Sequence, residues 1–251
     1  TPAAQPGRHA TSTAAPGAIW PATPSISPRR ASQCDAMGML AIIGGGNMGF
    51  AIARGAAEHR PGGAAQIVIA EPDASRRPLL SALGVHVVAR AGDALRMLDA
   101  HGRVVLAVKP QVFGAVAREL SHTGLLHNRL FVSVMAGLPS ATVHEALLPA
   151  GSPGGSAVSG GAGAGAAPRV VRVMPNLPVS IEKGMTAVCP GPGATDADLA
   201  FTHDLFAALG DVVRIDEALM DAFTAVAGSG PAYVFYLAEA MVKGAIAAGF
   251  D

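Results

Sequence analysis

Short apolar runs alternate with longer segments of helical pattern along the chain from residue 39 onward. The apolar runs LAII, QIVIA, VHVV, RVVLAV and RLFVSV lie at 40–43, 66–70, 85–88, 103–108 and 129–134, and helical patterns follow them at 47–60, 74–83, 93–100, 112–120 and 140–148. This alternation predicts repeated strand–helix–strand units. Because the strands are rich in Val and Ile throughout, we expect an α/β fold whose parallel sheet is covered on both faces, with ligand at the carboxyl ends of the strands.

The second half of the chain continues with shorter elements. We expect sheet segments at 169–175 and 184–190, a helix at 196–209, a strand at 211–215, and helical material from Glu217 to the end. Pro231 follows Gly228, Ser229 and Gly230, and this order is typical of a helix start. The predicted organisation is an extension at 1–36, a dinucleotide-binding domain at 37–215 with a glycine-rich loop at 151–168, and the start of a helical domain at 216–251.

The first apolar run leads directly into a glycine-rich turn. Gly44, Gly46 and Gly49 have GxGxxG spacing, and a helical pattern starts at Asn47 and Met48. A side chain at the first two glycines would stop the tight turn and keep a pyrophosphate away from the main chain, and the N–H groups of the helix N-terminus can bind phosphate. The strand, loop and helix occur in the required order, which favours a dinucleotide site over a merely tight turn.

Composition narrows the function classes. The 251 residues are 50% hydrophobic, and 18 Lys and Arg balance 18 Asp and Glu, so nucleic acid and membrane are not expected as partners. The 2 cysteines match no metal or disulfide spacing, and we expect no metal site, a reducing compartment and a cytoplasmic location. Residues 1–36 have no acidic residue before Asp35 and are predicted to be disordered; an organellar transit peptide is the alternative.

Five ordered motifs between Met39 and Asp251 resemble those of the pyrroline-5-carboxylate reductases. They are IGGGNMGFAI (43–52), LAVKPQ (106–111), VMAG (134–137), RVMPNLP (172–178) and DAFTAVAGSGPAYVF (221–235). The resemblance implies an N-terminal Rossmann domain followed by an all-α dimerisation domain, and a homodimer or higher homo-oligomer. It also implies reduction of a cyclic imino acid to L-proline with NADPH or NADH, the last step of proline biosynthesis.

The sequence departs from the family pattern at two places. Leu177 stands where the family has a threonine, so a hydroxyl is missing near the expected nicotinamide site. The family continues with further helices and a loop that holds the substrate carboxylate, whereas this sequence stops at Asp251. We therefore expect the chain as given to bind NAD(P)H and to turn over substrate poorly.

Imine reduction needs a hydride donor, a clamp for the substrate carboxylate and little acid catalysis. The resemblance and the positions of the residues together suggest Lys109, Asn176 and Ser229 as catalytic, and Ser229, Gly230 and Glu217 as substrate-binding. The predicted cofactor-binding residues are Gly44, Gly46, Asn47, Met48, Gly49, Glu71, Val108, Lys109, Pro110, Ala136, Gly137 and Asn176. Structural alternatives remain for four of the candidate site residues: a solvated strand-end lysine at 109, a turn residue at 176, a helix cap at 229 and a surface capping carboxylate at 217.

Glu71 ends the second strand about twenty residues beyond the glycine loop, where a carboxylate binds the ribose hydroxyls of NADH. Arg76 and Arg77 follow closely and suit the 2′-phosphate of NADPH, so the preference for NADH is slight. A β-hydroxyacid dehydrogenase is the rival enzyme class, which would need a catalytic lysine on a later helix, and Lys243 is the only lysine on the last one. The third alternative is a dinucleotide-binding module without catalysis.

Overall fold

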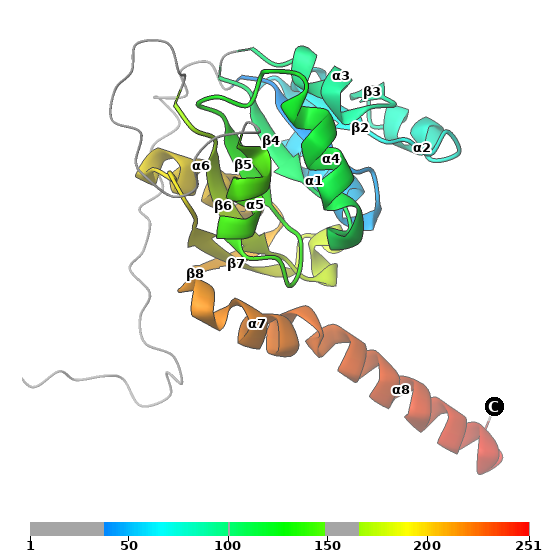
Figure 1. Cartoon of the computed structure of the whole chain (residues 1–251). Helices are drawn as coiled ribbons and strands as arrows, with labels where there is room; N and C mark the ends of the chain where they lie inside the picture. Colours follow the sequence, from blue (N-terminus) through cyan, green and yellow to red (C-terminus); the bar gives the residue numbers. More distant parts are fainter. Residues whose placement is uncertain (1–37, 100, 149–165, 251) are drawn as a thin grey trace, which may run out of the picture.

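The chain forms one twisted sheet flanked by helices, with a helical segment leading away from it (Figure 1). The computed structural model describes residues 38–99, 101–148 and 166–250. The predicted extension at 1–36 and most of the predicted loop at 151–168 lie outside the described residues. The strands are β1 (Leu40–Ile43), β2 (Ile67–Ala70), β3 (His86–Val88), β4 (Arg103–Leu106), β5 (Leu130–Ser133), β6 (Arg169–Met174), β7 (Gly184–Pro190) and β8 (Gly210–Arg214).

The strands join in the order β3-β2-β1-β4-β5-β6-β7-β8. The expected parallel sheet is confirmed for every pair except β6 and β7, which are antiparallel. The connection at 175–183 is too short for a parallel crossover, which needs about a dozen residues or more, and this explains the exception. The segments at 169–175 and 184–190 therefore extend the same sheet.

Helices cover both faces of the sheet, as the strand composition predicts. They are α1 (Asn47–His59), α2 (Arg77–Ser81), α3 (Ala91–Arg96), α4 (Pro110–Ser121), α5 (Ser140–Leu147) and α6 (Asp196–Ala207), with 3₁₀ turns η2 (Gly63–Gln66) and η3 (Leu177–Ile181). Alternate residues of β1 face opposite ways: Leu40 and Ile42 pack with α1 and α6, and Ala41 and Ile43 pack with α3, α4 and α5. This burial on two sides explains the uninterrupted apolar runs.

Two helices are shorter than predicted. The expected helix at 74–83 is only α2, because the Asp73 carboxylate accepts the Ser75 N–H at 2.9 Å and holds the chain in a turn before it. The expected helix at 93–100 starts and ends earlier, at Ala91 and Arg96. The remaining helices agree with the sequence pattern to within a few residues.

The last elements form a continuous helical segment: η4 (Glu217–Leu219), α7 (Met220–Phe223), a π-helical turn η5 (Thr224–Gly228) and α8 (Gly230–Ala247). Figure 1 shows α8 leading away from the sheet, and its apolar side chains are exposed, including Tyr236 at 76% and Met241 at 68%. Among the described residues, no helix combines the length and the hydrophobicity needed to cross a membrane.

Candidate functional site: a glycine loop at the carboxyl edge of the sheet

The glycine loop lies where the strand order reverses. It follows β1, which has β2 on one side and β4 on the other, and ligands of open α/β sheets bind outside the strand ends at this point. The Gly44 N–H donates to the Ala70 carbonyl at 2.9 Å, and the Ala107 N–H donates to the Ile43 carbonyl at 2.8 Å. The loop is thus fixed to both neighbouring strands.

The three motif glycines are required for different reasons. Gly44 has φ +105°, and a Cβ there would lie 2.6 Å from the Ala107 carbonyl oxygen. A Cβ at Gly49 would collide with the Gly44 carbonyl oxygen. At Gly46, by contrast, an added Cβ would meet no described atom within 4 Å. The protein itself needs glycine at the first and third positions, whereas the second opens onto free space that a phosphate can approach.

The first turn of α1 presents main-chain donors to that space. Gly46 is the N-cap and has no side chain that could cap the helix, and its carbonyl accepts the Phe50 N–H at 2.8 Å. The N–H groups of Asn47, Met48 and Gly49 consequently lack partners within the helix. With the positive end of the helix dipole, they form an arrangement suited to an anionic pyrophosphate.

Glu71 is bound to the loop itself. Its carboxylate accepts the Gly45 N–H and the Asp73 N–H, both at 2.9 Å, and the residue is 8% exposed. Glu71 therefore connects the loop after β1 with the loop after β2. The two arginines that follow also hold main chain, since Arg76 donates to the Gly45 carbonyl at 3.1 Å and Arg77 to the Glu71 carbonyl at 2.8 Å. The contact between Glu71 and a ribose stays a prediction.

An apolar pocket of about 260 Å³ lies between the ends of β1, β2 and β4 and the helices α3 and α4. Its lining is Ile43, Ala70, Pro72, Ala89, Ala91, Val108, Val112, Ala115, Val116 and Glu119. The flat faces of an adenine ring suit such a lining. The sequence predicted only Val108 among these residues, because the others come from separate strands, loops and helices whose meeting the sequence does not show.

The later predicted cofactor residues lie along the same edge. Lys109 is exposed and is the N-cap of α4, and Pro110 is the first residue of that helix. Ala136 and Gly137 follow β5 and are exposed, with Gly137 at φ +69° and no described atom near its Cβ position. Because β1, β4, β5 and β6 are parallel, their carboxyl ends bring these loops to one side of the sheet.

Asn176 connects this edge to the C-terminal helices. It is 8% exposed, its side-chain Nδ2 donates to the Ala227 carbonyl at 3.0 Å, and its Oδ1 accepts the Met185 N–H at 2.9 Å. Ala227 belongs to the π turn η5, whose C-cap is Ser229. Ser229 occupies the N-cap of α8, but its side chain makes no capping bond, and a Cβ at Gly230 would meet open space. These residues are therefore placed beside the sheet edge, and their contact with substrate stays a prediction.

Glu217 interacts with the sheet domain. Its carboxylate accepts the Ser140 N–H at 2.7 Å and the Ser140 hydroxyl at 2.6 Å, and it pairs with Arg172 at 3.2 Å. Burial alone would raise the pKa of Glu217, but these partners together lower it below its ordinary value. They also occupy both carboxylate oxygens, so the substrate role of Glu217 stays a prediction.

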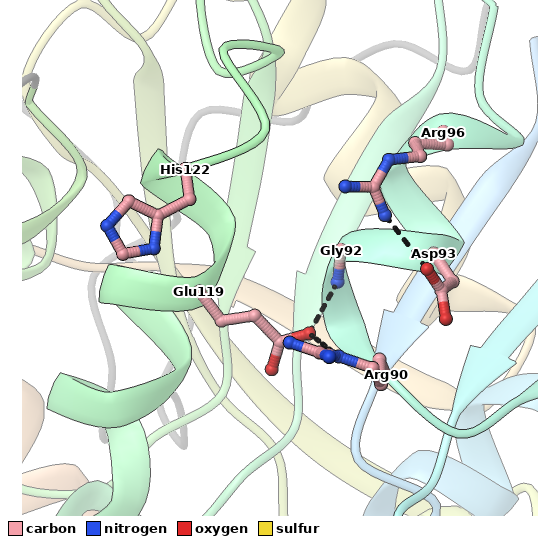
Figure 2. Close-up of a pocket in the computed structure, with 6 residues that line it drawn as sticks. All are labelled: Arg90, Gly92, Asp93, Arg96, Glu119 and His122. Atoms are coloured by element: carbon pink, nitrogen blue, oxygen red, sulfur yellow. Dashed lines mark hydrogen bonds and ion pairs between the residues drawn. The ribbon is translucent and has the colours of Figure 1, made fainter.

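A separate polar pocket of about 380 Å³ lies between α3 and α4 (Figure 2). Its charged residues pair with one another: Arg96 with Asp93 at 2.8 Å, and Arg90 with Glu119 at 3.4 Å. Glu119 also accepts the Gly92 N–H at 3.0 Å. Because these charges are mutually compensated, the pocket itself gives no evidence of a ligand.

Comparisons of the sequence with known proteins point to the same kind of site. Residues 39–137 match the family described as NADP oxidoreductase coenzyme F420-dependent, and residues 217–251 match the pyrroline-5-carboxylate reductase dimerisation family. The pyrroline-5-carboxylate reductase of Methanosarcina acetivorans is 33% identical over 84% of this chain and 71% of its own length, and that of Mycobacterium tuberculosis is 36% identical over 86% and 68%.

Solved structures show the same fold. The pyrroline-5-carboxylate reductase of Coxiella burnetii has a TM-score of 0.69 and 26% identity, covering 86% of this chain and 73% of that one. The Plasmodium falciparum pyrroline carboxylate reductase, solved with NADP bound, has a TM-score of 0.68 and 24% identity, with 85% and 71% covered.

Proposed function

Since the chain belongs to the pyrroline-5-carboxylate reductase family, we propose that it reduces 1-pyrroline-5-carboxylate to L-proline with NADPH or NADH. The observation that carries the proposal is the glycine loop at the point where the strand order reverses, with open space at Gly46 and the apolar pocket at the neighbouring strand ends. The nicotinamide cofactor supplies the hydride for the imine carbon.

The chain's own residues have mainly positional roles in this proposal. The first turn of α1 binds the pyrophosphate, the apolar pocket takes the adenine, and the loops after β4 and β5 flank the nicotinamide half. Ser229 and Gly230, at the N-terminus of α8, offer donors to an anionic substrate group. Accurate placement of the imine carbon beside the hydride donor is the main contribution to rate in such a reaction.

We further propose a homodimer or higher homo-oligomer, supported by the exposed apolar side chains of α8 and by the dimerisation match over residues 217–251. A cytoplasmic location is also proposed, on the ground that Cys189 is a buried free thiol.

The rival enzyme class receives less support. A β-hydroxyacid dehydrogenase would need a catalytic lysine near the cofactor, but Lys243 pairs with Glu239 on the solvent-exposed α8. Figure 1 shows the C-terminal end of this helix far from α1, the helix that follows the glycine loop.

The test follows oxidation of NADPH and of NADH by absorbance, with pyrroline-5-carboxylate as substrate and a 3-hydroxy acid with oxidised cofactor as the comparison. Cofactor binding is measured separately by fluorescence titration. Turnover of the imine alone supports the proposal, and turnover of the hydroxy acid contradicts it. Tight cofactor binding without any turnover favours the non-catalytic dinucleotide-binding module.

A further inference from the structure

Two arginines meet at the edge of the sheet opposite the glycine loop. Arg103 is the first residue of β4, and Arg60 is the C-cap of α1. Both lie against Phe201 of α6: the guanidinium carbon of Arg103 is 4.2 Å from the ring centroid, and that of Arg60 is 5.4 Å from it. One aromatic ring therefore holds two guanidinium groups close together.

Three of the nitrogens of these two guanidinium groups lack acceptors among the described residues. Within the described part of the chain, Arg60 Nε, Arg60 Nη1 and Arg103 Nη1 are buried without a hydrogen-bond partner. The remaining contact of Arg60 is a long one, from Nη2 to the Gly38 carbonyl at 3.4 Å. Buried charged donors without partners are costly, and native structures rarely keep them without a reason.

The nearby carboxylates have other partners. Asp198 pairs with Arg169 at 2.7 Å and accepts the Thr195 hydroxyl at 2.7 Å. Asp99 accepts the His101 N–H at 2.8 Å. Burial, and then the charge of Arg103, lower the pKa of Arg60 to about 10, and burial also lowers the pKa of Arg103. At neutral pH the site thus holds two positive charges that no described acid neutralises by contact.

We propose that Arg60 and Arg103 form a binding site for a small oxyanion, with inorganic phosphate as its simplest probe. Phosphate offers several acceptor oxygens, and guanidinium groups bind such oxygens in the plane of their N–H donors. The site is separate from the cofactor loop, since it lies at the opposite ends of β1 and β4, and it does not depend on the proposed reaction.

The experiment compares unfolding midpoints and isothermal titration in phosphate and in chloride at equal ionic strength and neutral pH. Phosphate is expected to raise the midpoint of the natural chain. Arg60→Met and Arg103→Met, which keep an apolar stem against Phe201, are expected to weaken phosphate binding about tenfold or more. Arg96→Met is the matched control, because Arg96 is exposed and pairs with Asp93, and it should respond as the natural chain does.

A further variant separates the effect of the positive charge from that of the guanidinium geometry. Arg103→Lys retains the charge and should bind phosphate more weakly than arginine but better than methionine. Equal phosphate responses in the natural chain and both methionine variants, or no response in any of them, would overturn the proposal.

Discussion

Replacing Glu217 should weaken the attachment of the C-terminal helical segment to the sheet domain and lower the free energy of unfolding. Its carboxylate accepts two hydrogen bonds from Ser140, at 2.7 and 2.6 Å, and pairs with Arg172 at 3.2 Å. Ser140 is 2% exposed, so its N–H and hydroxyl would lose their acceptor without direct access to water. Each such loss costs about 1–3 kcal/mol, and a hydrogen bond to a charged group is worth about 1.5–3 kcal/mol.

Contact with solvent reduces the expected loss in the free energy of unfolding. The Glu217 side chain is 34% exposed, so water can replace part of what is lost. We therefore expect Glu217→Ala to lower the free energy of unfolding by about 3 kcal/mol, and Glu217→Gln, which keeps one acceptor oxygen, by about half of that. Asp221→Asn is the matched control: it contacts the same arginine, but its side chain is 84% exposed, and its loss should be below about 0.5 kcal/mol.

The assay is urea unfolding followed by circular dichroism, at several pH values. The lowered pKa of Glu217 sets the sign of the pH dependence: the stabilisation is complete above the unfolded-state pKa of about 4.3 and is lost as the pH falls through the lower folded-state pKa. The difference between the natural chain and Glu217→Gln should shrink in that acidic range. Equal losses for Glu217→Gln and Asp221→Asn at neutral pH would refute the reasoning.

Three further predictions concern the loop, the cofactor and the sheet edge. Gly46→Val should abolish dinucleotide binding in a fluorescence titration without lowering the unfolding midpoint, whereas Gly49→Ala should lower the midpoint because its Cβ meets the Gly44 carbonyl oxygen; unchanged affinity for Gly46→Val would remove the pyrophosphate assignment. Glu71→Ser should weaken NADH binding more than NADPH binding, since Arg76 and Arg77 remain, and an unchanged ratio of the two dissociation constants would contradict a role in cofactor choice. Burial raises the pKa of Asp198, but Arg169 and Thr195 together hold it below its ordinary value. Asp198→Asn should therefore lower the free energy of unfolding in urea titrations at neutral pH, and by progressively less as the pH falls below about 4. A difference between the natural chain and this variant that stays constant down to that pH would show that the charge is not responsible.

The fold was largely predictable because burial on two faces leaves a clear pattern in the sequence. The runs at 40–43 and 184–190 coincide with β1 and β7. The antiparallel pairing of β6 with β7 was not predicted, since direction depends on the length of the connection and not on the residues of the strands. The shortened α2 depends on a local side-chain bond of Asp73 that competes with helix formation.

The candidate site was predictable at the glycine loop and less so elsewhere. Spacing alone identifies Gly44, Gly46 and Gly49, but it does not show that only Gly46 opens onto free space. The apolar pocket was not predicted, because its lining combines strand-end residues with residues of α3 and α4 that are far apart in the sequence. The partners of Glu71 and Glu217 are equally invisible, because each bond joins residues of different elements.

Asn176 holds other residues of the candidate site in position. Both ends of its amide are bonded to main chain, one to the start of β7 and one to the π turn before Ser229. A π turn leaves carbonyls that the regular helix pattern does not satisfy, and Asn176 supplies the donor for one of them, at Ala227. The amide thereby fixes where α8 begins relative to the sheet edge. If Ser229 and Gly230 bind substrate, Asn176 acts on the reaction by holding them in place, and it does so without needing to touch the substrate itself.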